Sequence, residues 1–218
     1  MNGPRIPLER AHPDAPGFRM PFSFVLRRGI IPWIRYKPSP GRSALKWRYA
    51  YVRRYARNKD VLDVPCGMGW GTSLITRARS VVAIDKCEEA IREAQKRYPS
   101  AARFMVGDMQ ELSVASSSFD VVSCLEGIEH VTESVAIAFL REVRRVLRDS
   151  GTLILSSPFV PGGTHSGNPH HLREYQPHEL RALIADHFTI EEESFRAYGS
   201  VTILLVRAVT RRRGISNE

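Results

Sequence analysis

The chain has 218 residues, 43% hydrophobic and 25% charged, a balance typical of one ordinary globular domain that buries its core without disulfides. No apolar run approaches the roughly 18 residues that a membrane-spanning helix needs, and the proline- and arginine-rich start does not resemble a secretory signal. Cys66, Cys87 and Cys124 show no CxxC spacing, so we expect a reducing cytoplasmic location.

The formal net charge is +9, and much of the excess lies between Arg27 and Arg57 and in the cluster Arg211-Arg212-Arg213. Two interpretations stay open. The charge favours an anionic partner, which could be a phosphorylated substrate, a nucleic acid or an acidic membrane surface met by the basic N-terminal segment. Alternatively, it forms a solvated basic face that only aids solubility.

The predicted elements alternate between strands and helices. Residues 1–41 are proline-rich and basic without periodicity and predict an arm or cap over the cleft, residues 42–210 the main domain, and residues 211–218 a basic tail. Helices are predicted over 43–57, through 74–75, and over 88–98, 134–147 and 177–185. Strands are predicted over 61–64, 81–84, 103–106, 119–125, 152–156, 188–195 and 201–209, with a turn at 149–151. This order predicts a mostly parallel sheet with helices on both faces and a ligand site at the carboxyl edge.

The sharpest motif is a buried strand that runs into three alternating glycines, Gly67, Gly69 and Gly71. Glycine lets the backbone approach a ligand closely, and a helix start behind the turn offers unpaired N–H groups. The G-x-G-x-G spacing differs from the G-x-G-x-x-G of nicotinamide dinucleotide sites. Asp63 precedes the glycines, and a carboxylate there suits a cationic ligand group better than a pyrophosphate.

Carboxylates also follow the next two predicted strands. Asp85 could accept hydrogen bonds from both hydroxyls of a ribose. Asp108 could accept from an adenine amino group while Met109 packs on the ring. A single acid of this kind is explained as a turn cap, but acids after three successive strands beside the glycines favour a nucleoside ligand.

From about residue 45 to 195 the chain resembles the Rossmann-like S-adenosylmethionine-dependent methyltransferases. The resemblance rests on the segments Val61–Gly71, Val82–Asp85, Gly107–Met109 and Ser118–Val122. It implies a doubly wound α/β fold with a mostly parallel seven-stranded sheet and an antiparallel strand near the C-terminus.

The resemblance also implies a site for S-adenosylmethionine. In that family Asp63 and the glycines contact the methionine end, Asp85 the ribose and Asp108 the adenine. Arg48 matches an arginine that pairs with the methionine carboxylate in some members, whereas Pro65 departs from the usual glycine. The implied cofactor-binding residues are Arg48, Asp63, Gly67, Gly69, Gly71, Asp85, Lys86, Asp108, Met109 and Leu125.

A second group of polar residues follows the fourth predicted strand. Glu126, Glu129 and His130 stand at i, i+3 and i+4, so one helical turn would put them on one face, where they could hold a divalent cation. The pattern resembles metal-dependent small-RNA 2′-O-methyltransferases and ubiquinone-biosynthesis O-methyltransferases. Asn168–Tyr175 resembles a segment of bacterial polysaccharide and natural-product methyltransferases, and that alignment makes His171 the fourth candidate ligand, for Mg, Mn, Fe or Zn. The alternative is that Glu129-His130 only caps a helix.

These motifs favour an O-methyltransferase whose acceptor is a hydroxylated small molecule, such as a sugar, phenolic or natural-product intermediate, neutral or anionic. Glu126 and His130 are the candidate catalytic residues, because His130 or a bound cation would help to ionise a hydroxyl. An RNA 2′-O-methyltransferase stays open, although the sequence shows no basic platform interleaved with aromatics. A scaffold that binds the cofactor without activity also stays open. The lone His12, His178 and His187 are expected on the surface.

Overall fold

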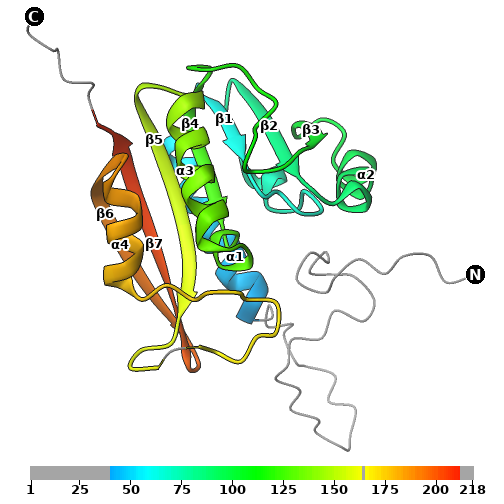
Figure 1. Ribbon diagram of the computed structural model, residues 1–218. Helices are drawn as coiled ribbons and strands as arrows, with labels where there is room; N and C mark the ends of the chain where they lie inside the picture. The colour runs from blue at the N-terminus through cyan, green and yellow to red at the C-terminus, as the bar shows by residue number, and fades with distance from the viewer. Residues whose placement is uncertain (1–39, 164, 212–218) are drawn as a thin grey trace, which may run out of the picture.

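The computed structural model describes residues 40–163 and 165–211, so most of the predicted arm and basic tail lies outside the described residues (Figure 1). The helices are α1 (Pro40–Tyr55), α2 (Glu88–Arg97), α3 (Glu133–Val146) and α4 (Pro177–Ala185), with 3₁₀ turns η2 (Thr72–Leu74) and η3 (Ile128–His130). The strands are β1 (Asp60–Asp63), β2 (Ser80–Asp85), β3 (Arg103–Val106), β4 (Phe119–Leu125), β5 (Leu147–Phe159), β6 (Phe188–Tyr198) and β7 (Val201–Thr210). None of these helices is both long and apolar enough to cross a membrane.

The seven strands form one sheet in the order β3-β2-β1-β4-β5-β7-β6. Strands β1 to β5 pair in parallel, and β7 is antiparallel to both β5 and β6. The chain builds outward from β1 to β3 and then returns to place β4 on the other side of β1. The switch point between β1 and β4 is where an open α/β sheet binds its ligand. The predicted α/β fold and its antiparallel C-terminal strand are confirmed.

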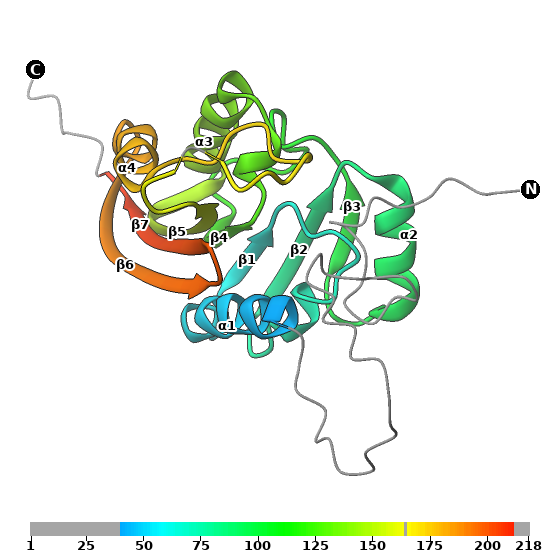
Figure 2. The ribbon, with the colours of Figure 1, turned by 90° about the horizontal axis from the view of Figure 1, so that it is seen from below.

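Helices cover both faces of the sheet, as Figure 2 shows from below. Along β1 successive side chains alternate between the faces: Val61 packs with Tyr49 and Val52 of α1, whereas Leu62 packs in the core beneath α3 and α4. Helix α2 packs beside β2 and β3 through a smaller cluster that includes Phe104. Both layers therefore hold β1 from either side and fix the position of the loop that follows it.

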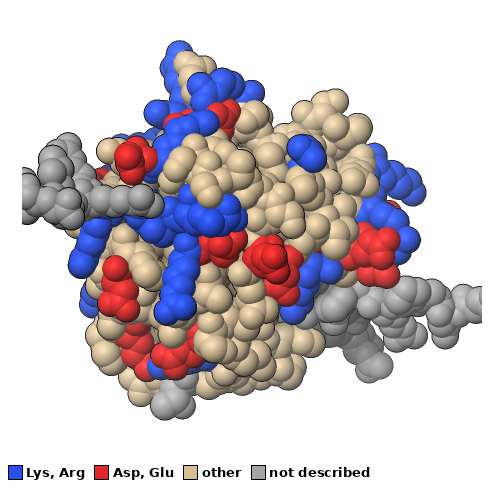
Figure 3. All heavy atoms as spheres, turned by 45° about the horizontal axis from the view of Figure 1, so that its top comes forward, with Lys and Arg blue, Asp and Glu red and all other residues tan. Residues whose placement is uncertain are grey.

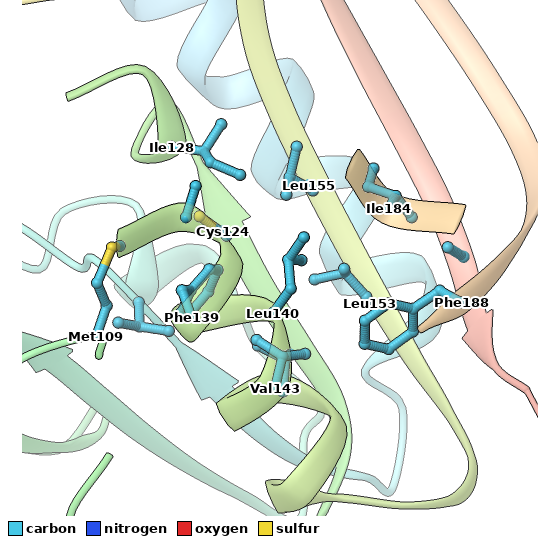
Figure 4. Close-up of a cluster of buried hydrophobic side chains, with 14 of the residues drawn as sticks. Met109, Cys124, Ile128, Phe139, Leu140, Val143, Leu153, Leu155, Ile184 and Phe188 are labelled. Atoms are coloured by element: carbon cyan, nitrogen blue, oxygen red, sulfur yellow. The ribbon is translucent and has the colours of Figure 1, made fainter. Parts of the chain in front are cut away.

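Helix α3 supplies much of the larger core. Its buried residues recur at helical spacing and are Ala136, Phe139, Leu140, Val143 and Val146. In Figure 4 these side chains meet Leu153 and Leu155 of β5 and Phe188 of β6. Each large side chain buried here contributes about 1.5–3 kcal/mol of transfer free energy, so the sheet centre is the rigid part of the molecule.

Two predicted local features were wrong. The helix expected through Leu74 and Ile75 is only the 3₁₀ turn η2, because the chain must reach β2 at Ser80 and has no room for a returning helix. The turn expected at residues 149–151 lies inside β5, where Ser150 has a φ of 62° and the pairing with β4 shifts register after Phe119.

Candidate functional site

The glycine loop leaves β1 at the carboxyl edge of the sheet and is fastened to the end of β2. The N–H of Gly67 donates to Asp85 Oδ2 and the N–H of Cys87 to Oδ1, each at 2.9 Å. Gly67 has a φ of 53°, and a Cβ built on it would meet no atom within 4 Å. This side of the loop is therefore open, whereas a Cβ on Gly69 would come within 2.8 Å of Phe104. Gly67 offers close backbone approach to a ligand, and Gly69 serves packing.

Gly71 is required by an aromatic side chain. A Cβ on Gly71 would lie 1.9 Å from the Tyr49 ring, which crosses the loop from α1. The Tyr49 hydroxyl donates to Asp63 Oδ2 at 3.0 Å. Gly71 thus lets Tyr49 reach Asp63, a contact between residues 14 positions apart.

Asp63 is fully buried and accepts three hydroxyl hydrogen bonds. Besides Tyr49, Thr72 donates to it at 2.6 Å and Ser123 of β4 at 2.6 Å. These bonds tie the glycine loop to α1 and β4. Because its acceptor oxygens are occupied and it has no exposed surface, we interpret its role as holding the loop rather than contacting a ligand directly.

Burial raises the pKa of Asp63 to about 6 from 3.8, against the three hydroxyl donors, which lower it. Between about pH 4 and 6 the folded chain keeps a proton that the unfolded chain loses, so the free energy of unfolding falls as the pH rises. We expect Asp63→Asn, which cannot ionise, to gain about 2–3 kcal/mol relative to the wild type between pH 4 and 7, measured by urea unfolding. The control is Asp149→Asn, because the Asp149 side chain is 95% exposed. If the free energy of unfolding of Asp63→Asn and of the wild type changed with pH in the same way, the raised pKa of Asp63 would be contradicted.

Arg48 lies buried on α1 beside the same loop, 5% exposed. Its Nε and Nη1 have no hydrogen-bond partner among the described residues, and Nη1 lies 3.8 Å from Glu126 Oε2. A buried guanidinium with unused donors is costly until an anion completes it. The pairing of Arg48 with a ligand carboxylate, which the resemblance implies, stays a prediction.

The other predicted cofactor residues divide into exposed and buried ones. Lys86 and Asp108 are exposed at the carboxyl edge, where Asp108 accepts from the Gln110 N–H at 2.9 Å. Met109 is 8% exposed and its side chain lies in the core of Figure 4, so its packing on an adenine ring stays a prediction. Leu125 is likewise buried, against α1, so only its backbone faces the site.

Glu126, Glu129 and His130 do not share one helical turn, and this part of the prediction was wrong. Glu126 has a φ of 54°, and η3 begins only at Ile128. Its Oε1 accepts from Ser156 Oγ at 2.9 Å, and its Oε2 faces Arg48. A left-handed backbone at a glutamate is strained, and such strain is common where a side chain must be aimed at a functional site.

Three of the four predicted metal ligands converge. Potential ligand atoms of Glu129, His130 and His171 all lie within 4.8 Å of one another, and the imidazole rings are 4.9 Å apart. Glu126 is not in this group. The Glu129 carboxylate is fully buried, and no other residue that the structure describes forms a hydrogen bond with it. Burial and then repulsion from Glu126 hold the pKa of Glu129 well above its usual value.

His171 is held by a residue that the sequence analysis missed, Glu174. The buried Glu174 carboxylate lies 2.5 Å from His171 Nδ1 and accepts from the Ser166 N–H at 2.8 Å. The Asn168 amide nitrogen lies 2.9 Å from His171 Nε2, which assigns the proton of the ring to Nδ1. The H-x-x-E spacing carried this signal, since i and i+3 side chains meet in a tight turn.

The segment of residues 165–175 is also bound to Glu129 and His130. His130 Nδ1 lies 3.0 Å from the His170 carbonyl, and the Leu172 N–H donates to the Glu129 carbonyl at 2.8 Å. Segments 40 residues apart are thus locked together at the carboxyl edge. The site pairs a nucleoside-binding glycine loop with a cluster of one carboxylate and two imidazoles.

Residues 61–151 match the model of a methyltransferase domain family. A probable S-adenosylmethionine-dependent methyltransferase of Mycobacterium tuberculosis is 40% identical over 133 residues, which are 59% of this chain and 47% of that protein. A ubiquinone biosynthesis O-methyltransferase of Xanthomonas campestris is 30% identical over 126 residues, 56% of this chain and 52% of the relative. The chain spans about half the length of these curated relatives.

Solved structures share the fold. A 1,6-didemethyltoxoflavin-N1-methyltransferase of Burkholderia thailandensis, with bound S-adenosylhomocysteine, has a TM-score of 0.67 at 22% identity and covers 77% of this chain and 78% of its own. The [4+2]-cyclase SpnF has a TM-score of 0.69 at 16% identity, covering 81% and 83%. Fold and site together define a nucleoside-binding α/β domain of the doubly wound class. Over the matched part of its length the chain is similar to S-adenosylmethionine-dependent methyltransferases.

Proposed function

We propose that this chain transfers the methyl group of S-adenosylmethionine to a hydroxyl oxygen of a small molecule. The carrying observation is the unpartnered, buried carboxylate of Glu129 in contact range of His130 and His171 at the carboxyl edge. This cluster is suited to activate a hydroxyl, because its residues could take a proton and could also bind a cation. The similarity to ubiquinone biosynthesis O-methyltransferases supports oxygen as the methylated atom.

The chain's own residues fit the cofactor at both ends. The unused donors of Arg48 would bind the methionine carboxylate, and the open side of Gly67 would admit the amino-acid end. Asp85 and Asp108 would accept from the ribose hydroxyls and the adenine amino group. When bound, S-adenosylmethionine supplies a methyl group on a positively charged sulfur, ready for in-line displacement. Positioning of the acceptor by the protein then accounts for much of the rate.

His130 is proposed to take the proton of the acceptor hydroxyl. Because its Nδ1 lies 3.0 Å from the His170 carbonyl, the ring proton belongs on Nδ1, and Nε2 is then a proton acceptor. Glu126, next to Arg48 and bonded to Ser156, is the second candidate. Its carboxylate would orient the acceptor hydroxyl between His130 and the glycine loop.

A divalent cation is proposed as the alternative way to ionise the hydroxyl, because a cation bound to Nε2 of His130 would leave that ring no nitrogen to take the proton. One carboxylate and two imidazoles suit Mn²⁺, Fe²⁺ or Zn²⁺ better than Mg²⁺, which prefers oxygen ligands. Glu129 has unused oxygens, and Glu174 orients His171 in the way that an outer carboxylate orients a metal-binding imidazole. The cation would lower the pKa of the acceptor hydroxyl.

The two other interpretations predict different products. An RNA 2′-O-methyltransferase needs a basic surface with aromatic platforms near the site, whereas the described surroundings include four histidines and several carboxylates. The histidines are His130, His165, His170 and His171. A scaffold would bind the cofactor and produce no methylated product. Cytoplasmic location stays a prediction, supported by the free thiols of the three cysteines.

The test is methyl transfer from labelled S-adenosylmethionine by the full chain to phenols, sugars and RNA 3′ ends. Each acceptor is assayed after EDTA treatment and again with Mn²⁺ or Zn²⁺ restored. We expect label in hydroxylated small molecules, less after EDTA, and recovery with metal. Label in RNA alone would establish the first alternative, and cofactor binding with no labelled product would establish the scaffold. If EDTA does not change the activity, a role for the divalent cation is excluded, but the role of His130 as proton acceptor is not.

A further inference from the structure

A second polar cavity lies far from the glycine loop, at the edge of the sheet where the parallel strands begin. It has a volume of about 350 Å³ and lies between the last turns of α3, the segment before β4 and the turn from α4 into β6. Its lining residues are Ser116, Ser117, Arg141, Arg144, Arg145 and His187. Figure 3 turns this edge toward the viewer and shows Lys and Arg side chains gathered on it among fewer acids. His187, expected as a plain surface residue, is half-buried in this wall.

One arginine builds the cavity. Arg145 binds the Glu142 carboxylate through Nε and Nη2, each at 2.7 Å, so its charge is neutralised. It also donates to the carbonyls of Leu112 and Val114, at 2.8 and 2.9 Å. These bonds fasten the segment before β4 onto α3. The wall that carries Ser116 and Ser117 is therefore held in place before any ligand arrives.

The other two arginines keep their charge. The Arg144 side chain is 18% exposed, and its nearest acid is Asp149 at 3.9 Å, which is 95% exposed. A contact of that length to a fully solvated carboxylate neutralises little. Within residues 40–163 and 165–211 no acidic side chain pairs with Arg141, which is exposed at the rim. Among the described residues, the cavity thus presents one guanidinium group without an acidic partner, that of Arg141, and one with only a long contact to an exposed acid, that of Arg144.

Two hydroxyls complete the donor set. Ser116 Oγ accepts from Arg145 Nη1 at 3.2 Å, which leaves its own proton to donate elsewhere. Ser117 has a φ of 50°, and its N–H donates to the Arg145 carbonyl at 2.9 Å, so a left-handed turn sets the position of its side chain. Hydroxyls and guanidinium groups around one space match the oxygens of a tetrahedral dianion.

A purely structural explanation covers only part of this. Basic residues in the last turn stabilise a helix through its dipole, and Arg144 and Arg145 lie in the last turn of α3. The dipole does not explain a cavity lined by two serine hydroxyls, nor the charge of Arg141, which lies one turn before the helix end.

We propose that this cavity binds the phosphate group of a phosphate monoester. Its volume exceeds what inorganic phosphate fills, which leaves room for a small organic group on the ester oxygen. The site stands at the opposite edge of the sheet from the glycine loop, so it is separate from the cofactor and acceptor sites. A soluble ester and the monoester headgroup of a lipid share this chemistry.

The experiment is calorimetric titration of the full chain with glycerol 3-phosphate at low ionic strength, without cofactor. The double variant Arg141→Gln/Arg144→Gln should weaken binding about tenfold or more. The control Arg92→Gln/Arg97→Gln removes the same charge from α2, where both arginines pair with glutamates, and should leave the affinity unchanged. Equal weakening by both pairs, or no binding by the wild type, overturns the site.

Two further measurements separate the outcomes. Flotation with phosphatidylcholine vesicles, with and without phosphatidic acid, shows whether the site binds a lipid headgroup in preference to the soluble ester. Whichever ligand is preferred, loss of its binding in the Arg141→Gln/Arg144→Gln variant supports the site. Amide shifts caused by glycerol 3-phosphate should centre on Ser116, Ser117 and His187, and should shrink in Arg141→Gln, whose exposed position spares the fold. Shifts confined to the glycine loop overturn the proposal. Methyl transfer by these variants is expected to be unchanged, so failure here leaves the proposed function standing.

Discussion

His130→Ala is expected to lower kcat of methyl transfer by about 10²–10⁴-fold while the affinity for S-adenosylmethionine stays unchanged. The imidazole lies in the cluster with Glu129 and His171, and its Nε2 is the proposed proton acceptor. The proposed cofactor contacts of Arg48 and Asp85 do not involve His130. The measurements are steady-state kinetics with the acceptor found in the panel and calorimetry with S-adenosylhomocysteine.

The matched control is His178→Ala, because His178 is an exposed histidine on α4 and should retain wild-type kcat. Glu129→Gln separates the two ways in which the cluster could act. If a cation assists, Glu129→Gln should lose both kcat and the restoration of activity by Mn²⁺ after EDTA. If His130 acts alone, Glu129→Gln should retain most activity. A His130→Ala variant with wild-type kcat would leave only positioning as the source of the rate.

The fold was predictable from local patterns because most of its helices and strands have an apolar periodicity that is visible in the sequence. Strand β4 is a run of apolar and small residues that ends at Leu125, and α4 begins at a proline and carries Leu180 and Ile184 on its buried face. The same logic failed at Leu74, because helix formation there depends on the distance to β2 and not on the residues themselves. Ser150 was expected in a turn, and it lies instead in an irregular stretch of β5, between the pairs Phe119–Leu147 and Val121–Thr152, where its φ is 62°.

The candidate site was predictable where residues close in sequence stay close in space. Asp85 and His130 were predicted because each follows a strand, and the structure places both at the carboxyl edge, after β2 and β4; their roles stay predictions. Glu126 was placed wrongly, since a left-handed backbone at a glutamate has no signal in spacing. The partners of Asp63 and the role of Glu174 depend on contacts such as Ser123 to Asp63, 60 positions apart, which no short motif records.

Arg48→Met is expected to weaken binding of S-adenosylmethionine and S-adenosylhomocysteine by about 10–100-fold, because hydrogen bonds to a charged group are worth about 1.5–3 kcal/mol. The free energy of unfolding without ligand should not fall. Nε and Nη1 of this guanidinium are buried and form no hydrogen bond with any described residue, so an apolar side chain of similar length removes a desolvation cost. If Arg48 instead stabilised the fold, Arg48→Met would lower the free energy of unfolding.

The ligand control is 5′-methylthioadenosine, which keeps the adenosine and the sulfur but lacks the carboxylate and amino group of the methionine end. Arg48→Met should bind it as the wild type does, whereas Asp85→Ala should weaken all three ligands through the ribose. The variant control is Arg53→Met, an exposed arginine on the same helix, which should change neither affinity nor stability. If Arg48→Met weakens 5′-methylthioadenosine as strongly as S-adenosylhomocysteine, Arg48 supports the loop and does not bind the carboxylate. If only the ligands with the carboxylate are affected, the unused donors of Arg48 are the anchor of the methionine end, and the orientation of the cofactor in the cleft follows from it.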